Sequence, residues 1–240
     1  MSRKANWKVG VVLGVVVAIM VTSGGFVMAS NLGFKLNRSF VTNFATGTSP
    51  IGDNWVSFPY NSPYVNVTSL CSQLGLTGTS QVIQVNAANG VVTTSNCLGQ
   101  PTNYALQTNA GVLIRILAPT PASAIIVGSS NESMAFGTFG NPSTLTGNFG
   151  SGTAPIGDNW LSIPYHTTST DAASVCADLG LNVAPGGLVF HRIASTGSSE
   201  SRDCVSGGGG FTGPLKLGEA ILVRKNNPSG NIVGHLPPHY

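Results

Sequence analysis

The sequence has few charged residues. Asp, Glu, Lys and Arg make up 8% of the 240 residues, whereas a typical globular domain contains about 25%. Three of the eleven basic residues precede residue 10, so the remaining chain carries eight basic and eight acidic residues. Without a surplus of Lys and Arg, the chain lacks the basic patch by which proteins bind nucleic acids. A surface of Ser, Thr, Asn and Gly with net charge near zero instead favours association.

Several motifs of enzymes and metal sites are also absent. There is no G-x-S-x-G nucleophile turn, no D-x-D-x-D-G run for calcium and no C-x-x-C pair for zinc. The glycine run 207–210 is not followed by the Lys and helix of a phosphate-binding loop, so we interpret it as a flexible loop. The sequence therefore predicts no catalytic residue, no metal ligand and no cofactor.

The N-terminus resembles an export signal. Arg3, Lys4 and Lys8 precede an uncharged run, and Val27-Met28-Ala29 places small residues where a signal peptidase cuts. We expect residues 1–29 to be a signal peptide. The alternative is an uncleaved membrane anchor, because about twenty uncharged residues suffice to span a bilayer. In both cases the rest of the chain is exported to the periplasm, the cell surface or the extracellular space.

An internal repeat organises the rest of the chain. Residues 50–55 and 155–160 both read Pro-Ile-Gly-Asp-Asn-Trp, and the similarity continues to Leu74-Gly75-Leu76 and Leu179-Gly180-Leu181. The chain is therefore two copies of one module. We place the first module at residues 30–133 and the second at 134–240, each large enough for a modest core of its own.

The four cysteines fall two per module, at equivalent places in the repeat. Because an exported chain meets oxidising conditions, we predict one disulfide inside each module, Cys71–Cys97 and Cys176–Cys204. Free or metal-bound thiols are the alternative.

Short alternating or β-branched runs predict strands. The expected strands are 36–44, 55–60, 81–85, 91–94, 111–117 and 124–127 in the first module and 188–193, 219–224 and 231–233 in the second. We expect hairpin turns at Ala88-Asn89-Gly90 and at Thr196-Gly197. The fold class is thus mainly β, with two tandem modules that resemble β-sandwiches or barrels.

One short helix is expected in each module, and it is clearest in the second. Ser169 or Thr170 can cap it, Asp171 suits the helix N-terminus and Gly180 ends it. This helix carries Cys176, as its counterpart carries Cys71.

These motifs resemble a module that recurs, often in tandem, in secreted and surface-attached bacterial proteins. Its opening N-W-x-S-x-P is matched by residues 54–59 and 159–164, its L-x-x-G-x-G/A-hydrophobic-Val segment by 217–223 and, less closely, by 106–114, and its closing I-V-G by 126–128 and 232–234. The resemblance implies a small β-rich fold and an extracellular setting, and it attaches no catalytic residues.

The repeated Asp and Asn residues are candidates for a site. Asp53, Asn54, Asp158 and Asn159 follow a glycine in both copies, and we interpret them as a structural turn in which the side chains bond their own backbone. The alternative is a set of calcium ligands.

Aromatic residues come directly after the repeated Asp-Asn pair in both copies. In an alternating strand Trp55 and Tyr60 face opposite sides, so one of the two faces is core. We expect Trp55 and Trp160 to be buried, because an indole buries much apolar area. The alternative is an aromatic platform for sugars, and on that hypothesis Tyr60 and Tyr165 are the glycan contacts.

All four histidines, His166, His191, His235 and His239, lie in the second module. A hydrolase would require them to line one pocket. The prolines between His235 and His239 exclude a helix that would align them, and we interpret that end of the chain as frayed.

Three classes of function stay open. The composition favours a non-enzymatic structural or interaction protein, whose partners would be further copies of itself or other components of the cell surface, because strand edges serve as assembly surfaces. With two similar surfaces in series, such contacts could repeat head to tail. A pair of glycan-binding modules that retain polysaccharide is the alternative, and a secreted hydrolase is a minor one.

Overall fold

The computed structural model describes residues 33–42, 51–76, 78–117, 123–147, 156–165, 167–226 and 230–238. The expected signal peptide at residues 1–29 lies outside this part of the chain, as do His166 and His239. Among the described residues, none of the helices has the length and apolar character needed to cross a membrane.

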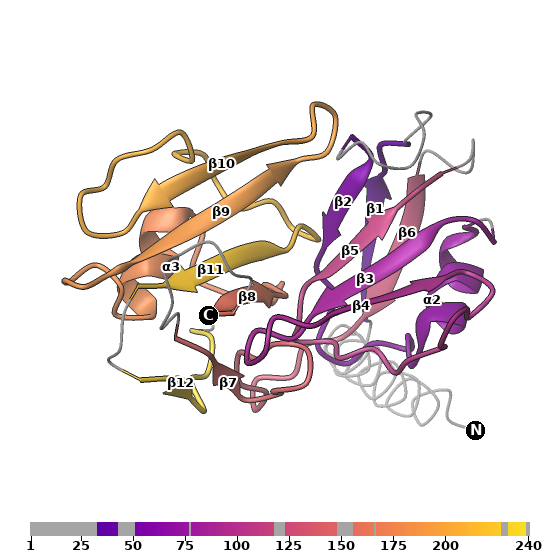
Figure 1. Ribbon diagram of the computed structural model, residues 1–240, viewed down its shortest axis with the longest axis horizontal. Helices are drawn as coiled ribbons and strands as arrows, with labels where there is room; N and C mark the ends of the chain where they lie inside the picture. The colour runs from indigo at the N-terminus through magenta and orange to yellow at the C-terminus, as the bar shows by residue number, and fades with distance from the viewer. Residues whose placement is uncertain are drawn as a thin grey trace, which may run out of the picture. The chain divides into compact units, whose positions relative to one another are not determined.

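The first copy is built from antiparallel strands and one helix (Figure 1). A four-stranded sheet has the order β2-β5-β3-β4, and a two-stranded sheet pairs β1 with β6. In chain order the elements are β1 Phe34–Ser39, β2 Asp53–Val56, α2 Val67–Leu74, β3 Gln81–Val85, β4 Val92–Asn96, β5 Val112–Arg115 and β6 Ser123–Gly128.

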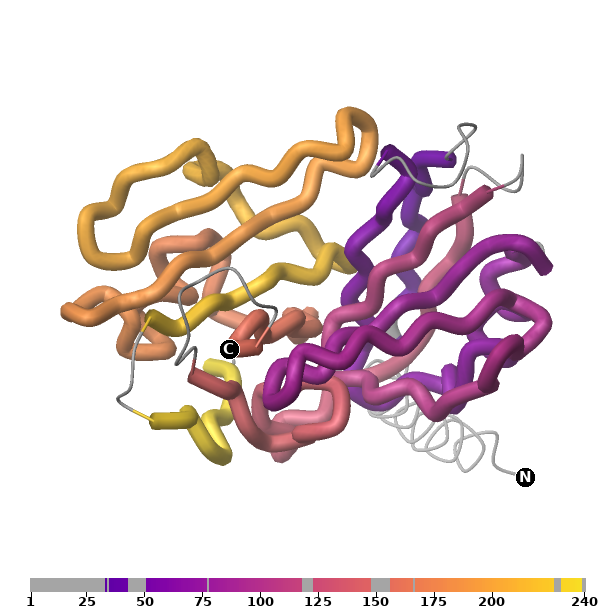
Figure 2. The backbone as a smooth tube through the Cα atoms, in the orientation of Figure 1, coloured from indigo at the N-terminus to yellow at the C-terminus, as the bar shows by residue number. Residues whose placement is uncertain are grey.

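The second copy repeats this arrangement, as the backbone trace shows (Figure 2). Its four-stranded sheet has the equivalent order β8-β11-β9-β10, and β7 pairs with β12. In chain order the elements are β7 Thr144–Leu145, β8 Asp158–Leu161, α3 Ala172–Asp178, β9 Gly187–Ile193, β10 Ser198–Asp203, β11 Ile221–Lys225 and β12 Ile232–Val233. The prediction of a mainly β chain with two similar halves is confirmed.

Each copy has a hydrophobic core of its own between its four-stranded sheet, its helix and its two-stranded sheet. In the first copy Val56 and Ile114 from the sheet pack with Leu70 from α2 and Ile126 from β6. In the second copy the corresponding core includes Leu161, Val175 and Val223. Side chains alternate between the two faces of a strand, so the opposite face of each sheet is left for other contacts.

Side-chain caps begin both helices. In α2 the Asn66 side chain accepts from the backbone N–H of Ser69, and Gly75 ends the helix at a φ of 65°. In α3 Asp171 takes the equivalent role and accepts from the backbone of Ser174. The prediction that Ser169 or Thr170 caps this helix is therefore wrong. Asp171 is itself the cap, because its carboxylate is the group that reaches the first free N–H donors.

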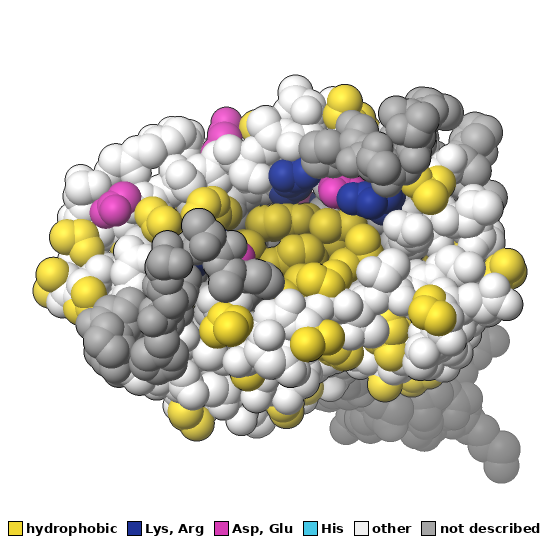
Figure 3. Space-filling model, viewed as in Figure 1, with side chains coloured by type: hydrophobic (Ala, Val, Ile, Leu, Met, Phe, Trp, Pro, Cys, Tyr) yellow, Lys and Arg dark blue, Asp and Glu magenta, His cyan; other side chains and the backbone are white. Residues whose placement is uncertain are grey.

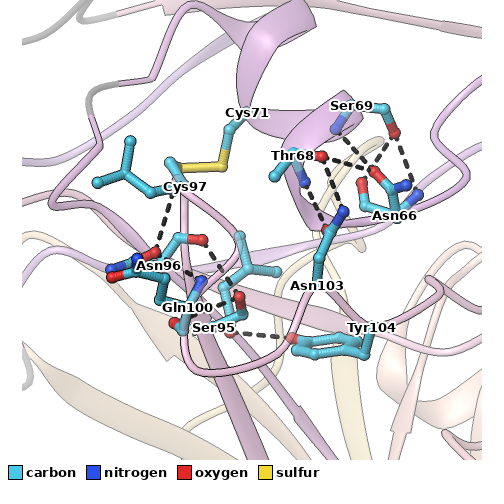
Figure 4. Close-up of a disulfide and its surroundings, with 12 residues drawn as sticks. Asn66, Thr68, Ser69, Cys71, Ser95, Asn96, Cys97, Gln100, Asn103 and Tyr104 are labelled. Atoms are coloured by element: carbon cyan, nitrogen blue, oxygen red, sulfur yellow. Dashed lines mark hydrogen bonds between the residues drawn. A yellow bond between two sulfur atoms is a disulfide. The ribbon is translucent and has the colours of Figure 1, made fainter.

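The disulfides Cys71–Cys97 and Cys176–Cys204 are present as predicted. Each joins the middle of a helix to the residue that follows the outer strand, β4 or β10. Figure 4 shows the disulfide of the first copy, Cys71–Cys97. The cysteines are 26 and 28 residues apart, and closing a loop of this size stabilises a fold by roughly 3 kcal/mol. Two disulfides indicate an oxidising, extracellular environment.

The cap of α3 predicts a pH dependence of stability. The hydrogen bond from the backbone of Ser174 lowers the pKa of Asp171 below its ordinary value. A carboxylate with a lowered folded pKa adds stability above its unfolded pKa, and that contribution is lost as the pH falls through the folded pKa. Asp171→Asn should therefore lower the free energy of unfolding by about 0.5–1 kcal/mol at neutral pH, with the difference vanishing in acid.

Urea unfolding at neutral and acidic pH measures this effect. The first copy supplies the matched control, because Asn66 caps α2 without a charge. Asn66→Asp should gain stability at neutral pH only. A difference between Asp171→Asn and the parent that is the same at both pH values would contradict the charge as its cause.

Candidate functional site

The repeated Gly-Asp-Asn-Trp segment does not form the turn expected from its sequence. The turn is confined to Ile51-Gly52, and Asp53 begins strand β2. Asp158 likewise begins β8. The interpretation of these residues as a turn is therefore wrong. One local bond of the expected kind is present, because Asn54 Nδ2 donates to the carbonyl oxygen of Gly52.

Asn54 instead ties three segments of the first copy together. Its Oδ1 accepts from the backbone N–H of Val41 at 2.9 Å, and its Nδ2 donates to the carbonyl oxygens of Val41 and Ile114 at 2.9 and 3.2 Å. Asn159 makes the same contacts with Thr146 and Val223 in the second copy. Both side chains are buried, so these bonds satisfy backbone groups that water does not reach.

Each repeated aspartate pairs with an arginine on the neighbouring strand. Arg115 donates to both carboxylate oxygens of Asp53 at 2.5 and 2.8 Å. Arg224 does the same for Asp158 at 2.6 and 2.8 Å. These bidentate bonds raise the pKa of both guanidinium groups. The carboxylates are thus used to join strands, and the described residues contain no group of three or more His, Cys, Asp and Glu that could hold a metal ion.

The two copies meet through equivalent residues. The hydroxyl oxygens of Ser57 and Ser162 are 2.7 Å apart. Ser57 Oγ donates to the carbonyl oxygen of Ile163, and Ser162 Oγ donates to that of Phe58. This exchange is the pattern of a symmetric dimer interface, in which residue i contacts j and j contacts i. An approximate two-fold axis therefore relates the copies.

Backbone hydrogen bonds between the copies come in matching pairs. The carbonyl oxygen of Trp55 accepts from the N–H of Ala220, and that of Trp160 accepts from Gly111. The N–H of Ser57 donates to Gly218, and that of Ser162 donates to Asn109. The N–H of Gly52 donates to Ala194, and that of Gly157 donates to Ala87. The inner edge strands β2 and β8 are thus each covered by the other copy. Gly111 is needed at this contact, because a Cβ there would lie 2.8 Å from the Cβ of Ala220.

A third hydrophobic cluster fills the interface between the copies. Trp55 and Trp160 pack against each other with ring centroids 5.2 Å apart. Trp55 is buried as predicted, whereas Trp160 is partly buried. Their neighbours are Ile83, Leu113, Phe190, Ala220 and Leu222. Both copies contribute, so the tryptophans belong to a shared core.

A cavity of about 380 Å³ opens at one side of this interface, between β1 and β2 of the first copy and β9 of the second. Its walls include Arg38, Trp55, His191, Arg192 and Glu219. Figure 3 shows hydrophobic side chains in the hollow between the copies, with Lys, Arg, Asp and Glu side chains gathered along its edge. The volume is in the range of small-ligand sites, about 300–1,000 Å³.

Ion pairs and hydrogen bonds organise the charged wall of this cavity. His191 Nε2 lies 2.6 Å from Glu219 Oε2, and Arg38 lies 3.8 Å from the other oxygen of the same carboxylate. Burial alone would raise the pKa of Glu219, but the bond to His191 and the charge of Arg38 outweigh it and lower that pKa. The Arg38 and Arg192 side chains are only 11% and 17% exposed, and this burial lowers the pKa of both guanidinium groups.

The other candidate residues do not form a second site. Tyr60 is buried and donates to the carbonyl oxygen of Ser162, so it is no surface contact for a glycan. Tyr165 is also buried and borders an apolar cavity of about 320 Å³. His235 lies against Asp178 and Phe136, and it is not among the residues that line the cavity with His191.

No protein-family model matches this chain, and no curated protein or solved structure is significantly similar to it.

Proposed function

We propose that this chain is an exported, non-enzymatic protein of the cell surface or extracellular matrix, and that it binds further copies of itself through strand β4. Strand edges are the part of a β-fold that associates most readily, because their backbone groups can pair with another chain. The resemblance of the repeat to modules of surface-attached proteins, the export signal expected at residues 1–29 and the disulfides all support an extracellular setting.

The observation that carries this proposal is the contrast between the two outer edge strands. The sheets end at β4 in the first copy and at β10 in the second. Strand β4 reads Val-Thr-Thr-Ser-Asn and has no charged side chain, whereas β10 contains Glu200, Arg202 and Asp203. Charged side chains are the usual protection of an edge strand. Of these two outer edges, the one in the first copy is therefore the more open to pairing.

Hydrophobic exposure at the same edge supports this assignment. Val91 and Val92 are each 54% exposed. Contact with a second molecule would bury this apolar area. Two β4 strands from different molecules can pair antiparallel about a two-fold axis, which closes the contact as a dimer. A contact between β4 and the charged β10 of the next molecule, which would build an open filament, is disfavoured by the charges on β10.

Light scattering on the purified, oxidised protein tests this proposal. We expect a dimer that dissociates on dilution, and we expect Val92→Lys to shift the protein to monomer because it places a charge at the pairing edge. Val183→Lys is the matched control, since Val183 is 67% exposed and lies in the second copy, in the loop between α3 and β9. A protein that stays monomeric at near-millimolar concentration, or equal effects of the two lysines, would refute association through β4.

A further inference from the structure

The few charges of this protein are concentrated at the cavity between the copies. Five of the sixteen charged residues that follow residue 29 line it: Arg38, Arg192, Glu200, Lys216 and Glu219. The Asp53–Arg115 pair adjoins them, because Arg192 Nη2 lies 3.7 Å from Asp53 Oδ2. A chain that builds its surface almost entirely from uncharged residues thus gathers cations and carboxylates in one place.

The internal symmetry shows that the fold does not require these charges. Strands β3 and β9 are equivalent, with Gly90 and Gly197 in equivalent hairpin turns. On that alignment His191 and Arg192 replace Gln84 and Val85.

The same comparison applies to the segment before β11. The matching bonds of Gly111 and Ala220 to the two tryptophans align Lys216 and Glu219 with Gln107 and Ala110. The first copy therefore folds and meets its neighbour with uncharged residues at all four positions. The charges at the cavity break the symmetry of an interface that is otherwise closely repeated, so neither the fold nor the contact between the copies accounts for them.

Arg38 provides an unused donor at this site. Its side chain is 11% exposed, and Nη2 donates to the carbonyl oxygen of Trp55 at 2.9 Å. Its Nε is buried and makes no hydrogen bond with the described residues. A buried N–H without an acceptor is destabilising, and an oxygen of a bound ligand could accept from it.

We propose that the cavity binds a carboxylated sugar unit, such as the uronic acid of an acidic polysaccharide. The four cations Arg38, Arg115, Arg192 and Lys216 outnumber the three carboxylates Asp53, Glu200 and Glu219 by one, so the site favours an anion. Guanidinium groups suit carboxylates because they donate two parallel hydrogen bonds.

A sugar fits the remaining lining better than an acidic peptide does. The indole of Trp55 offers an apolar wall, while Ser39 and Ser195 offer hydroxyl groups and Glu219 offers carboxylate oxygens. Carboxylate acceptors bind sugar hydroxyls, and an acidic peptide such as triglutamate has none to offer. The site is separate from the β4 edge, so this proposal does not depend on self-association.

Calorimetric titration of the full protein with a galacturonic acid trisaccharide tests the proposal. The methyl-esterified trisaccharide is the matched probe, because it keeps the sugar rings and removes the charge, and triglutamate provides carboxylates without sugar. We expect binding of the acidic trisaccharide, weakened by salt, and at least tenfold weaker binding of the other two. Loss of one charge-assisted hydrogen bond accounts for about a tenfold change.

Three variants place the binding in the cavity. Lys216→Gln and Arg192→Gln should each weaken the trisaccharide at least about tenfold, while Arg202→Gln, which removes a cation of β10 outside the cavity lining, should not. Lys216 is exposed and its equivalent in the first copy is Gln107, so Lys216→Gln leaves the fold intact. If Arg192→Gln lowers the thermal unfolding temperature, the affinity of Lys216→Gln alone tests whether the trisaccharide binds in the cavity.

Each contrary outcome overturns a defined part of the proposal. Equal binding of the methyl ester would remove the role of the cations, and equal binding of triglutamate would remove the sugar. No heat of binding with millimolar trisaccharide, or the same loss in Arg202→Gln as in Lys216→Gln, would refute the site itself.

Discussion

Replacing Asn54 or Asn159 by alanine is expected to lower the free energy of unfolding by about 3 kcal/mol or more. Each amide satisfies a backbone N–H and carbonyl oxygens on three segments, and both side chains are buried. Alanine leaves these groups without partners, and every buried polar group left unsatisfied costs about 1–3 kcal/mol. Water cannot fully replace the amide without opening the packed strands.

Chemical unfolding with the disulfides intact measures this loss. Asn37→Ala is the control, because Asn37 is exposed on β1 and such surface changes stay within about 0.5 kcal/mol. Asn54→Asp is informative as well, since the carboxylate keeps the shape and the acceptor but cannot donate to the carbonyl oxygens of Val41 and Ile114. Losses below about 1 kcal/mol for the alanine variants would show that the strands rearrange and that the amide bonds are not essential.

The repeat made the architecture of each copy predictable. Equivalent cysteines in two copies of one module leave little choice of pairing, which is why Cys71–Cys97 and Cys176–Cys204 were predicted correctly. Strand β3 was predicted with its observed bounds, because Gln81–Val85 combines β-branched residues with a clear turn at Gly90. Signals of this kind depend only on residues close together in the sequence, so the strand and its turn can be predicted without knowing the rest of the fold.

The segment around Asp53 shows where local signals fail. Gly, Asp and Asn are turn formers, so the sequence favoured a turn at residues 52–54, and Asp53 and Asn54 instead begin a strand. Their partners Arg115 and Ile114 lie about sixty residues away in the chain. A contact across that separation has no local signature, and here it outweighs the intrinsic preference for a turn.

The cavity was missed for a related reason. A repeat predicts that two copies fold alike, but it does not predict which faces meet. Arg38, Arg192 and Glu219 come from distant segments and are brought together only by that contact. A signal was nevertheless present, because His191 and Arg192 stand where the first copy has Gln84 and Val85. Charge present at only one of two equivalent positions is the feature that could have indicated the site.

Truncating either tryptophan at the interface between the copies is expected to cause a large loss of stability. Trp55→Ala and Trp160→Ala should each lower the free energy of unfolding by about 3–5 kcal/mol, the usual cost of emptying an aromatic site, with Trp160 toward the lower end because it is only partly buried. The two rings come from different copies and pack against each other. Each substitution therefore removes a packing partner from the other copy as well as from its own. The sequence alone predicts that both tryptophans are buried, but it does not predict that they pack against each other.

A double-mutant cycle separates a shared core from two independent ones. Residues in contact show coupling energies of 0.5 kcal/mol or more, and an aromatic pair contributes about 0.5–1.5 kcal/mol beyond its buried area. The double variant should therefore lose less stability than the two single losses added together, and the whole protein should still unfold in one transition. Strict additivity, with a separate transition for each copy, would show that the interface contributes no coupling and that the two tryptophans stabilise their own copies alone.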